Sequence, residues 1–446
     1  MQTYGFDYVF AVSWVKINEA LARHLAGTSI ELNYAGQDSD TGSNIILRCR
    51  LAPWLITDGG GNTLVRLQLP IAGGSLELAG GALQGSYDLT GVSLVVEVSL
   101  SWIGAGQASL SGNVGLTKLA FSPSSGTDRN APGYVSIVNI LDPQKRLDTL
   151  AAGILSAHAV EILLSNKAQL EYIFAEVIPA PVGVGSWLQP RKWLYYNVAV
   201  KGGPNALCFL CLLDDREFPP GAPRFDASNL SAANDLVVLI SQPVFFANVL
   251  LPAVRASFGG ASFSQSCTND VCTVTNSGDF SVGNVQASHY SLAVDSAGNG
   301  LAISASGGGP LKFFFGVADL PNASYSWSVS SNNRQSFGNK VLSFTPDPQP
   351  NIQHSQDMPW YDWVLIVFTG ITNAVGLASA IYDAVKGFGD NSQEMGVGTI
   401  NSTLQSAIGG SLLNLGDLVD WHLAGQGLSL SSAGIEGALY VRGNFG

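Results

Sequence analysis

Charged side chains are scarce in this sequence. Asp, Glu, Lys and Arg make up 12% of the 446 residues, against about 25% in an ordinary domain. Positively charged residues are fewer than negatively charged ones: the sequence has 21 Lys and Arg and 33 Asp and Glu, which gives a net charge of −12. Because phosphate backbones repel such a chain, the composition excludes nucleic acid as a partner. Apolar residues reach 46%, so the protein must bury a large apolar surface within its fold or against an apolar ligand.

Cysteines are also few, and their number is odd. The five are scattered along the chain, which is unlike a small secreted domain stapled by disulfides, so reduced thiols are the expectation. Cys208 and Cys211 match C-x-x-C but lie in the apolar run Ala206 to Leu213, which predicts buried packing rather than redox or metal chemistry. Cys267 and Cys272 flank a polar Thr-Asn-Asp-Val segment. Whether these two cysteines form a disulfide after secretion is left undecided by the sequence.

The sequence lacks the signals of export and gives an ambiguous signal of membrane insertion. Met1 to Lys16 has neither an early positive charge nor a cleavage site, so we expect the chain to be cytoplasmic where it is synthesised. Trp363 to Tyr382 is twenty residues long and uncharged. Its apolar residues recur every three or four positions, which predicts an amphipathic helix packed in the protein rather than an integral membrane span. A span and an interfacial membrane contact remain alternatives.

No catalytic or metal-binding constellation is recognisable. The histidines at 24, 158, 289, 354 and 422 are isolated, and no G-x-S-x-G motif supplies a nucleophile. His158 lies one turn from Ile154 and Ile162, which favours a satisfied core or groove histidine. Asp295 to Gly300 has Ala297 where a calcium loop needs an oxygen ligand, so it predicts a hairpin turn. We therefore expect no enzyme activity, no metal and no cofactor.

Hydrophobic periodicity predicts an α+β fold. Helical spacing covers about Trp14 to Leu25, Asp142 to Phe174 and Gln242 to Phe258, the last bent at Pro252. Further helices are expected at about 360 to 386 and 400 to 421. Val92 to Trp102 alternates over eleven residues, a strand long enough to favour a twisted or curved sheet. Shorter strands are predicted at Leu64 to Leu69 and Ser75 to Leu78, and closing strands around Leu428 to Leu430 and Ala438 to Arg442.

Several segments, in the same order, resemble one bacterial family. They are Thr3 to Asp7 with Ile17-Asn18 and Leu21, Trp187 to Pro190 with Tyr195-Tyr196, Ala206 to Leu213, Val238 to Ser241 with Phe245-Phe246, and Val419 to Trp421. Together they resemble the forty-seven-kilodalton accessory proteins encoded beside clostridial neurotoxins. The resemblance implies the tubular lipid-binding (TULIP) architecture, in which long amphipathic helices are wrapped by a highly curved antiparallel β-sheet. It implies one elongated domain over residues 1–446. The coarse order of helix, strands and helix occurs in both halves of the sequence, which predicts a soft seam near 259 between 1–258 and 259–446.

Residue patterns and resemblance together predict a non-enzymatic protein that binds lipid or another hydrophobic ligand. It would be an accessory component of a toxin gene cluster, of the neurotoxin or insecticidal kind, and its partners would be an apolar ligand and toxin or other cluster-encoded proteins. Release with a toxin complex is an open alternative to a cytoplasmic location. A scaffold for cluster partners without a lipid cavity, and a membrane-inserting component, are the other functional alternatives. The candidate groove residues are Ile17, Leu21, Val364, Phe368, Ile371 and Val375.

Overall fold

The protein divides into two compact units. Unit 1 contains Met1–Asp7, Leu239–Leu413 and Leu430–Val441, and unit 2 contains Tyr8–Val238, Asn414–Ser429 and Arg442–Gly446. One of the boundaries between the units falls between Val238 and Leu239. The seam near residue 259 stays a prediction. A computed structural model describes residues 1–104, 117–177, 187–221, 223–258, 262–282, 285–312, 319–357, 397–407, 419–420 and 428–445.

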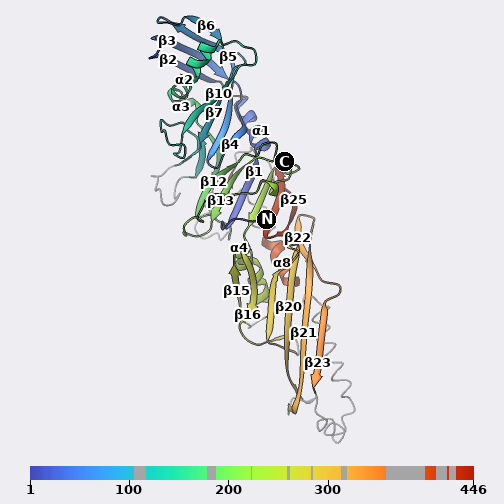
Figure 1. The fold of residues 1–446 in the computed structure, drawn as a ribbon. Helices are drawn as coiled ribbons and strands as arrows, with labels where there is room; N and C mark the ends of the chain where they lie inside the picture. Colours follow the sequence, from blue (N-terminus) through green and yellow to red (C-terminus); the bar gives the residue numbers. More distant parts are fainter. Residues whose placement is uncertain are drawn as a thin grey trace. The chain divides into compact units, whose positions relative to one another are not determined.

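Unit 2 contains a strongly bent antiparallel sheet of order β10-β7-β5-β3-β2, with β4 and β6 also pairing with β5 (Figure 1). The first part of β5 (Leu64–Ala79) pairs with β7 and β4, and its second part pairs with β3 and β6. Gly74 lies in the second part with a φ of +134°, and a Cβ atom there would clash with the backbone of Arg48 and Cys49. Only glycine fits this approach. The prediction of two separate short strands, Leu64 to Leu69 and Ser75 to Leu78, was therefore wrong.

The predicted eleven-residue strand Val92 to Trp102 is also interrupted. β7 (Ser93–Ser99) pairs with β5 and β10, whereas β8 (Ser101–Ile103) pairs with β9 in a different sheet. Between them, the Tyr195 hydroxyl accepts a hydrogen bond from the backbone N–H of Leu100 at 2.8 Å. A side chain thus replaces a neighbouring strand at this residue and lets the backbone change sheets.

Helix α2 (Thr149–Ser165) lies against the bent sheet, where it contacts β2 and β10. It begins at Asp148, whose carboxylate accepts a hydrogen bond from the Ala151 N–H at 2.8 Å. The prediction of one helix over Asp142 to Phe174 was too long, because the chain enters β11 at Tyr172. The other predicted helix of this unit, Trp14–Leu25, is α1 with the same bounds.

In chain order, the elements of unit 2 are β1 (Tyr8–Ser13), α1 (Trp14–Leu25), β2 (Ile30–Gln37), β3 (Asn44–Leu51), β4 (Leu55–Gly61), β5 (Leu64–Ala79), β6 (Gly85–Asp88), β7 (Ser93–Ser99), β8 (Ser101–Ile103), β9 (Lys118–Phe121), β10 (Val135–Leu141), α2 (Thr149–Ser165), α3 (Lys167–Leu170), β11 (Tyr172–Val177), β12 (Lys192–Val198), β13 (Ala206–Leu212), η1 (Ala227–Asn229), β14 (Leu236–Ile240) and β24 (Val419–Asp420). Strands β12, β13, β1 and β14 are successive neighbours in one sheet, and β24, β11, β9 and β8 in another.

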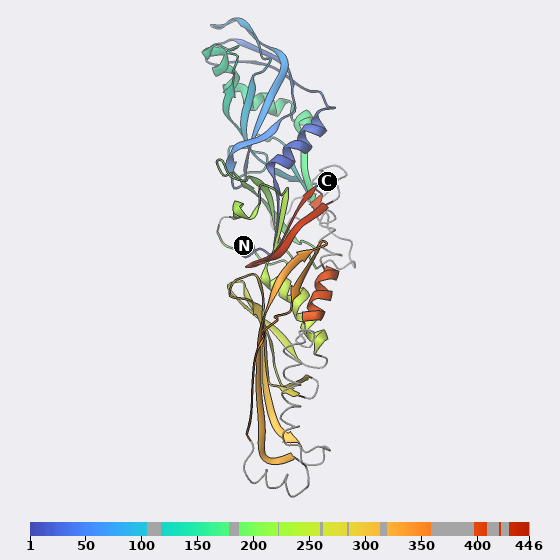
Figure 2. The same cartoon turned by 90° about the vertical axis from the view of Figure 1, so that its right-hand side faces the viewer.

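Unit 1 is dominated by a sheet of order β15-β16-β19-β20-β21-β22, in which β23 also pairs with β21. Figures 1 and 2 show the long strands β20 and β21 running side by side. Phe258, Phe263, Phe280 and Tyr290 form a buried aromatic cluster with ring centroids 5.2–6.4 Å apart. Gln242 to Ser257 is helical as predicted. The π-helical turn Phe246–Leu250 ends two residues before Pro252, whose ring nitrogen cannot donate the α-helical hydrogen bond.

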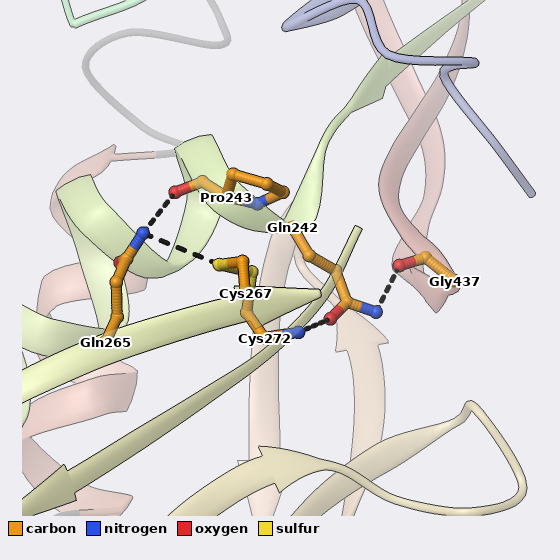
Figure 3. The surroundings of a disulfide bond; sticks show 6 residues. All are labelled: Gln242, Pro243, Gln265, Cys267, Cys272 and Gly437. Carbon is orange, nitrogen blue, oxygen red and sulfur yellow. Dashed lines mark hydrogen bonds between the residues drawn. A yellow bond between two sulfur atoms is a disulfide. The ribbon is translucent and has the colours of Figure 1, made fainter. Parts of the chain in front are cut away.

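Cys267 and Cys272 form a disulfide across the β15–β16 hairpin (Figure 3). They are paired residues of the two strands, joined by a tight turn whose Asn269 and Asp270 both have positive φ. Gln242 links this hairpin to the last strands: its side chain accepts from the Cys272 N–H at 2.9 Å and donates to the Gly437 carbonyl at 2.6 Å. The sequence left the state of this pair undecided, and the structure forms the disulfide because the register places the two sulfurs together.

In chain order, the elements of unit 1 are α4 (Gln242–Phe245), η2 (Phe246–Leu250), α5 (Leu251–Ser257), β15 (Phe263–Thr268), β16 (Val271–Asn276), β17 (Phe280–Val282), β18 (Val285–Ala287), β19 (His289–Val294), β20 (Gly300–Lys312), β21 (Asp319–Gly338), β22 (Val341–Thr345), β23 (Asn351–Asp357), α8 (Val397–Ala407), β25 (Leu428–Glu436) and β26 (Ala438–Phe445). The turn at Asp295 to Gly300 joins β19 and β20, as predicted. The helix predicted at about 400 to 421 is described only to Ala407, and Val419–Asp420 is a short strand. The helix predicted at about 360 to 386 lies outside the described residues.

The observed architecture confirms the α+β class with mainly antiparallel sheets. The longest helix in the described part of the chain is α2, with 17 residues. Across those same residues, no helix is both long enough and apolar enough to cross a membrane.

Candidate functional site

Hydrogen bonds fix the junction between β1 and α1 in unit 2. Ser13 ends β1 and accepts a hydrogen bond from the Lys16 N–H with its hydroxyl, which caps α1. The next residue, Trp14, is buried, and its indole N–H donates to the Asn197 side chain at 3.0 Å. Asn197 is itself fully buried and donates to the Leu64 carbonyl at 2.7 Å. The start of α1 is thus fixed, while Val15 points outward and is 69% exposed.

A cavity of about 600 Å³ opens beside this junction, and we call it the α1 cavity. Its volume lies within the range of small-molecule sites, about 300–1,000 Å³. Four segments contribute to it: the start of α1, the middle of β4, the β12–β13 loop and the segment before β14. The lining residues are Ser13, Trp14, Val15, Asn18, Asp58, Gly202, Gly203, Pro204, Asn205, Leu230, Ser231, Ala232, Asn234 and Asp235.

Two asparagines hold the walls of the α1 cavity in place. Asn18 makes two hydrogen bonds to the backbone of Ile56, accepting from its N–H at 2.8 Å and donating to its carbonyl at 2.9 Å. Asn205 accepts from the Val200 N–H at 2.6 Å with its side chain and from the Trp14 N–H at 3.0 Å with its backbone carbonyl. These contacts keep the loop of Gly202, Gly203 and Pro204 beside α1.

Two carboxylates line the α1 cavity. Asp58 is exposed and accepts a hydrogen bond from the Asn205 amide at 3.3 Å. Asp235 accepts from the Phe445 N–H at 2.9 Å and lies 3.7 Å from the Lys16 ammonium. Apolar side chains of Val15, Pro204 and Leu230 lie in the same lining. The cavity therefore combines an apolar wall with a few placed polar groups, as ligand sites usually do.

The structure describes two of the six predicted groove residues. Ile17 and Leu21 lie on α1 and are 4% and 1% exposed, respectively. They pack in the interior of unit 2 and are not among the residues that line the α1 cavity. That they contact a ligand stays a prediction. Val364, Phe368, Ile371 and Val375 lie outside the described residues.

The hydrophobic periodicity of the sequence does not reveal the α1 cavity. Its lining comes from four separate segments, and most of it consists of small or polar loop residues. The available signals were the glycine-rich turn after Asp58 and the Gly202-Gly203-Pro204 loop, which mark turns but do not show that the turns converge.

A second polar cluster surrounds His158 on α2. Its ring nitrogens lie 3.2 Å from an Asp38 carboxylate oxygen and 2.9 Å from a Glu161 carboxylate oxygen, and the Tyr34 hydroxyl donates to Glu161 at 2.6 Å. Burial lowers the pKa of His158, but hydrogen bonds and charges from Glu161 and Asp38 outweigh it and raise the pKa above its ordinary value. Burial and the Glu161 contact raise the pKa of Tyr34 to about 12.

The His158 cluster is a satisfied ionic network, in agreement with the prediction of a satisfied histidine. Both ring nitrogens already have carboxylate partners, and in the described part of the chain no group of His, Cys, Asp or Glu side chains is arranged to hold a metal ion. The C-x-x-C pair is likewise inert: Cys208 and Cys211 are buried in β13, and burial raises the pKa of Cys208 far above its ordinary value.

Three of the exposed apolar side chains lie on two elements that contact each other. Val138 and Leu141 on β10, and Leu150 on α2, are 42%, 38% and 60% exposed. We call them the β10–α2 patch. β10 is one of the two edge strands of the bent sheet, and an edge strand offers unpaired backbone groups to another chain.

Fold and site together define an α+β protein of bent antiparallel sheets with a partly apolar cavity beside its first helix. The family described as "OrfX-like: Protein OrfX2/OrfX3/P47" matches residues 3–295 of this sequence. The chain belongs to this family.

Individual relatives agree with that assignment. Protein P47 of Clostridium botulinum (strain Kyoto / Type A2) is 22% identical over 254 residues, which cover 56% of this chain and 56% of the relative. The matched stretch thus spans about half the length of this curated relative.

Two solved structures share the fold. P47 from Clostridium botulinum A2 aligns with a TM-score of 0.74 and 17% identity, over 100% of this chain and 98% of that one. P47 of Clostridium botulinum E1 aligns with a TM-score of 0.68 and 16% identity, over 99% and 100%. These alignments confirm the predicted fold class and the resemblance to the forty-seven-kilodalton accessory proteins.

Proposed function

We propose that this protein is a non-enzymatic accessory component of a toxin gene cluster that binds a lipid or another amphipathic ligand in the α1 cavity. The α1 cavity is the observation that carries this proposal. Its apolar lining of Trp14, Val15, Pro204 and Leu230 offers contact to an alkyl chain, and each buried methylene contributes about 0.8 kcal/mol. Its hydroxyl, amide and carboxylate groups would orient the polar end of the same molecule.

Val15 supports this proposal in particular. It is 69% exposed and belongs to the lining of the cavity, although the hydrogen bonds of Ser13 and Trp14 fix the start of α1. Exposed single valines are common on surfaces, but this one lies in a concave lining beside other apolar groups. A ligand that covers Val15 would remove apolar area from water.

Organic extraction of the purified protein, followed by mass spectrometry, tests the proposal. We expect a stoichiometric amphipathic molecule in the extract, and a reduced amount from the Val15→Asp variant. Val271→Asp is the matched control, because Val271 is 63% exposed in unit 1. An empty extract, together with no uptake of added lipid, would contradict the proposal.

A scaffold for cluster partners is the second candidate, and the β10–α2 patch favours it. Val138, Leu141 and Leu150 together offer an apolar surface that a partner protein could cover. Co-purification of the protein with the products of its neighbouring genes tests this role. We expect Leu150→Asp to weaken a complex formed through the patch, and an unchanged complex would exclude the patch as its interface.

We also propose that the protein is released into an oxidising environment. The Cys267–Cys272 disulfide supports this, because disulfides persist mainly outside the reducing cytoplasm. Counting free thiols in protein isolated from the culture medium and from the cells of the producing bacterium checks it. Three free thiols per chain are expected in the released protein and five in the cytoplasmic pool.

A further inference from the structure

We infer that the ligand of the α1 cavity carries a positively charged group, as an alkylammonium does, rather than a carboxylate or a phosphate. This inference rests on the proposed function, because it names the chemistry of the ligand that the same cavity would take. The observation behind it is the sign of the charges in the lining. Among the described lining residues, the charged side chains are Asp58 and Asp235.

The Asp58 carboxylate is open to a cationic partner. It is exposed, it accepts one hydrogen bond from the neutral Asn205 amide at 3.3 Å, and it forms no ion pair with a lysine or arginine of the described chain. The Arg66 guanidinium lies close by but donates to the backbone carbonyl of Asp58 at 3.1 Å and pairs with Glu97 at 2.6 Å. A ligand ammonium would therefore add a charge-assisted hydrogen bond that Asp58 otherwise lacks.

Asp235 does not reverse this preference. Lys16 lies 3.7 Å from Asp235, but it also lies 3.4 Å from Glu19. One ammonium is thus shared between two carboxylates, and the group of three keeps a net negative charge. Across the whole chain the net charge is −12, so the surrounding field also attracts cations and repels anionic amphiphiles.

The N-terminus of α1 acts in the opposite direction, since a helix N-terminus attracts anions. Two of its first three amide groups already have partners. The Trp14 N–H donates to the Asn205 carbonyl at 3.0 Å, and the Lys16 N–H donates to the Ser13 hydroxyl at 3.3 Å. An anionic head group would find few free donors here and two carboxylates, so the carboxylates decide the preference.

Three probes of equal chain length and different charge separate the head-group question from ligand binding itself. Decylammonium, decanol and decanoate are titrated calorimetrically into the full-length protein at neutral pH, each below its micelle concentration. We expect decylammonium to bind most tightly and decanoate least tightly, with about a fivefold difference between decylammonium and decanol, the upper range for an exposed ion pair. Raising the salt concentration should reduce this difference.

Substitutions at Asp58 locate the effect. Asp58→Asn should remove the advantage of decylammonium over decanol, and Asp58→Lys should make decanoate the better ligand. Asp40→Asn is the matched control, because Asp40 is an exposed carboxylate of unit 2 outside the cavity lining. Thermal unfolding of each variant verifies folding.

Two results would overturn the inference. If decanoate binds as tightly as decylammonium, or if Asp58→Asn leaves the order of affinities unchanged, the cavity does not select a cation, although the proposed binding of amphiphiles would stand. If none of the three probes binds, the proposed function fails together with the inference.

Discussion

The side chain of Asn166 makes both backbone hydrogen bonds of Asn33. Its carbonyl oxygen accepts from the Asn33 N–H at 3.0 Å, and its amide donates to the Asn33 carbonyl at 3.0 Å. It also donates to the carbonyl of Ile162 at 2.7 Å, at the end of α2. Because β2 is an edge strand, one side chain here takes the place of a missing neighbouring strand and joins the bent sheet to α2.

Replacing Asn166 with alanine should therefore destabilise unit 2. Asn166 is 6% exposed, and the substitution removes its bonds to the partly buried backbone of Asn33 and to the buried carbonyl of Ile162. We expect the free energy of unfolding to fall by about 2–3 kcal/mol in urea titrations. Asn139→Ala is the control: Asn139 is exposed and caps only the N–H of its neighbour Ile140, so a change within about 0.5 kcal/mol is expected. Equal effects of the two substitutions would contradict the edge-closing role of Asn166.

The His158 cluster should make the stability of unit 2 depend on pH. The pKa of His158 is raised above 6.5, while the pKa values of Asp38 and Glu161 are lowered. The histidine therefore contributes its full stabilisation below pH 6.5, and this contribution is lost as the pH rises through its folded pKa. The Asp38 and Glu161 carboxylates stabilise the folded protein at pH values above their ordinary pKa values. This stabilisation is lost as the pH falls through their lowered pKa values in the folded protein. Urea unfolding of the wild type and of His158→Gln across pH 5 to 9 should show a difference that shrinks with rising pH.

Tyr195 should stabilise the backbone at Leu100, between the end of β7 and the start of β8. Its hydroxyl donates to the Thr63 carbonyl at 2.6 Å and accepts from the Leu100 N–H at 2.8 Å, and burial raises its pKa to about 12. Tyr195→Phe leaves the Leu100 N–H buried without a partner, which should cost about 1–3 kcal/mol of unfolding free energy. Tyr87→Phe is the control, because Tyr87 bonds Asp148 at the surface. A smaller loss for Tyr195→Phe than for Tyr87→Phe would contradict this assignment.

The Cys267–Cys272 disulfide should stabilise unit 1 locally. The two residues are five positions apart, and closing so short a loop is worth about 2 kcal/mol in the chain-entropy account. Reduction should lower the unfolding temperature of the wild type, whereas the same reductant should not affect the Cys267→Ser/Cys272→Ser double variant. A wild type that is insensitive to reductant would show that the hairpin does not need the bond.

The sequence predicts the elements with strong periodicity and misses those that depend on long-range contacts. Trp14–Leu25 was predicted with its observed bounds because Ile17, Leu21 and Leu25 form one buried stripe. The break at Leu100 was not predictable, since its cause is the hydroxyl of Tyr195, about a hundred residues further along the chain. The Cys267–Cys272 disulfide could not be decided from the sequence for a similar reason, because it depends on the pairing register of β15 and β16.

The candidate site was less predictable than the fold. Apolar stripes identify buried helix faces, and Ile17 and Leu21 are indeed buried. The α1 cavity is instead lined by the opposite, exposed Val15 and by loops that meet only in the folded chain. No local sequence pattern indicates that these loops and the start of α1 lie close together in the folded chain.

The measurement that most directly tests ligand binding in the α1 cavity is photo-crosslinking with a diazirine-bearing decanol, followed by peptide mapping. If the cavity binds the ligand, we expect labels on the start of α1 around Val15 and on the segments of Pro204 and Leu230, and we expect unlabelled decanol to compete with the labelling. Labels confined to other parts of the chain, or labelling that decanol does not compete, would contradict it.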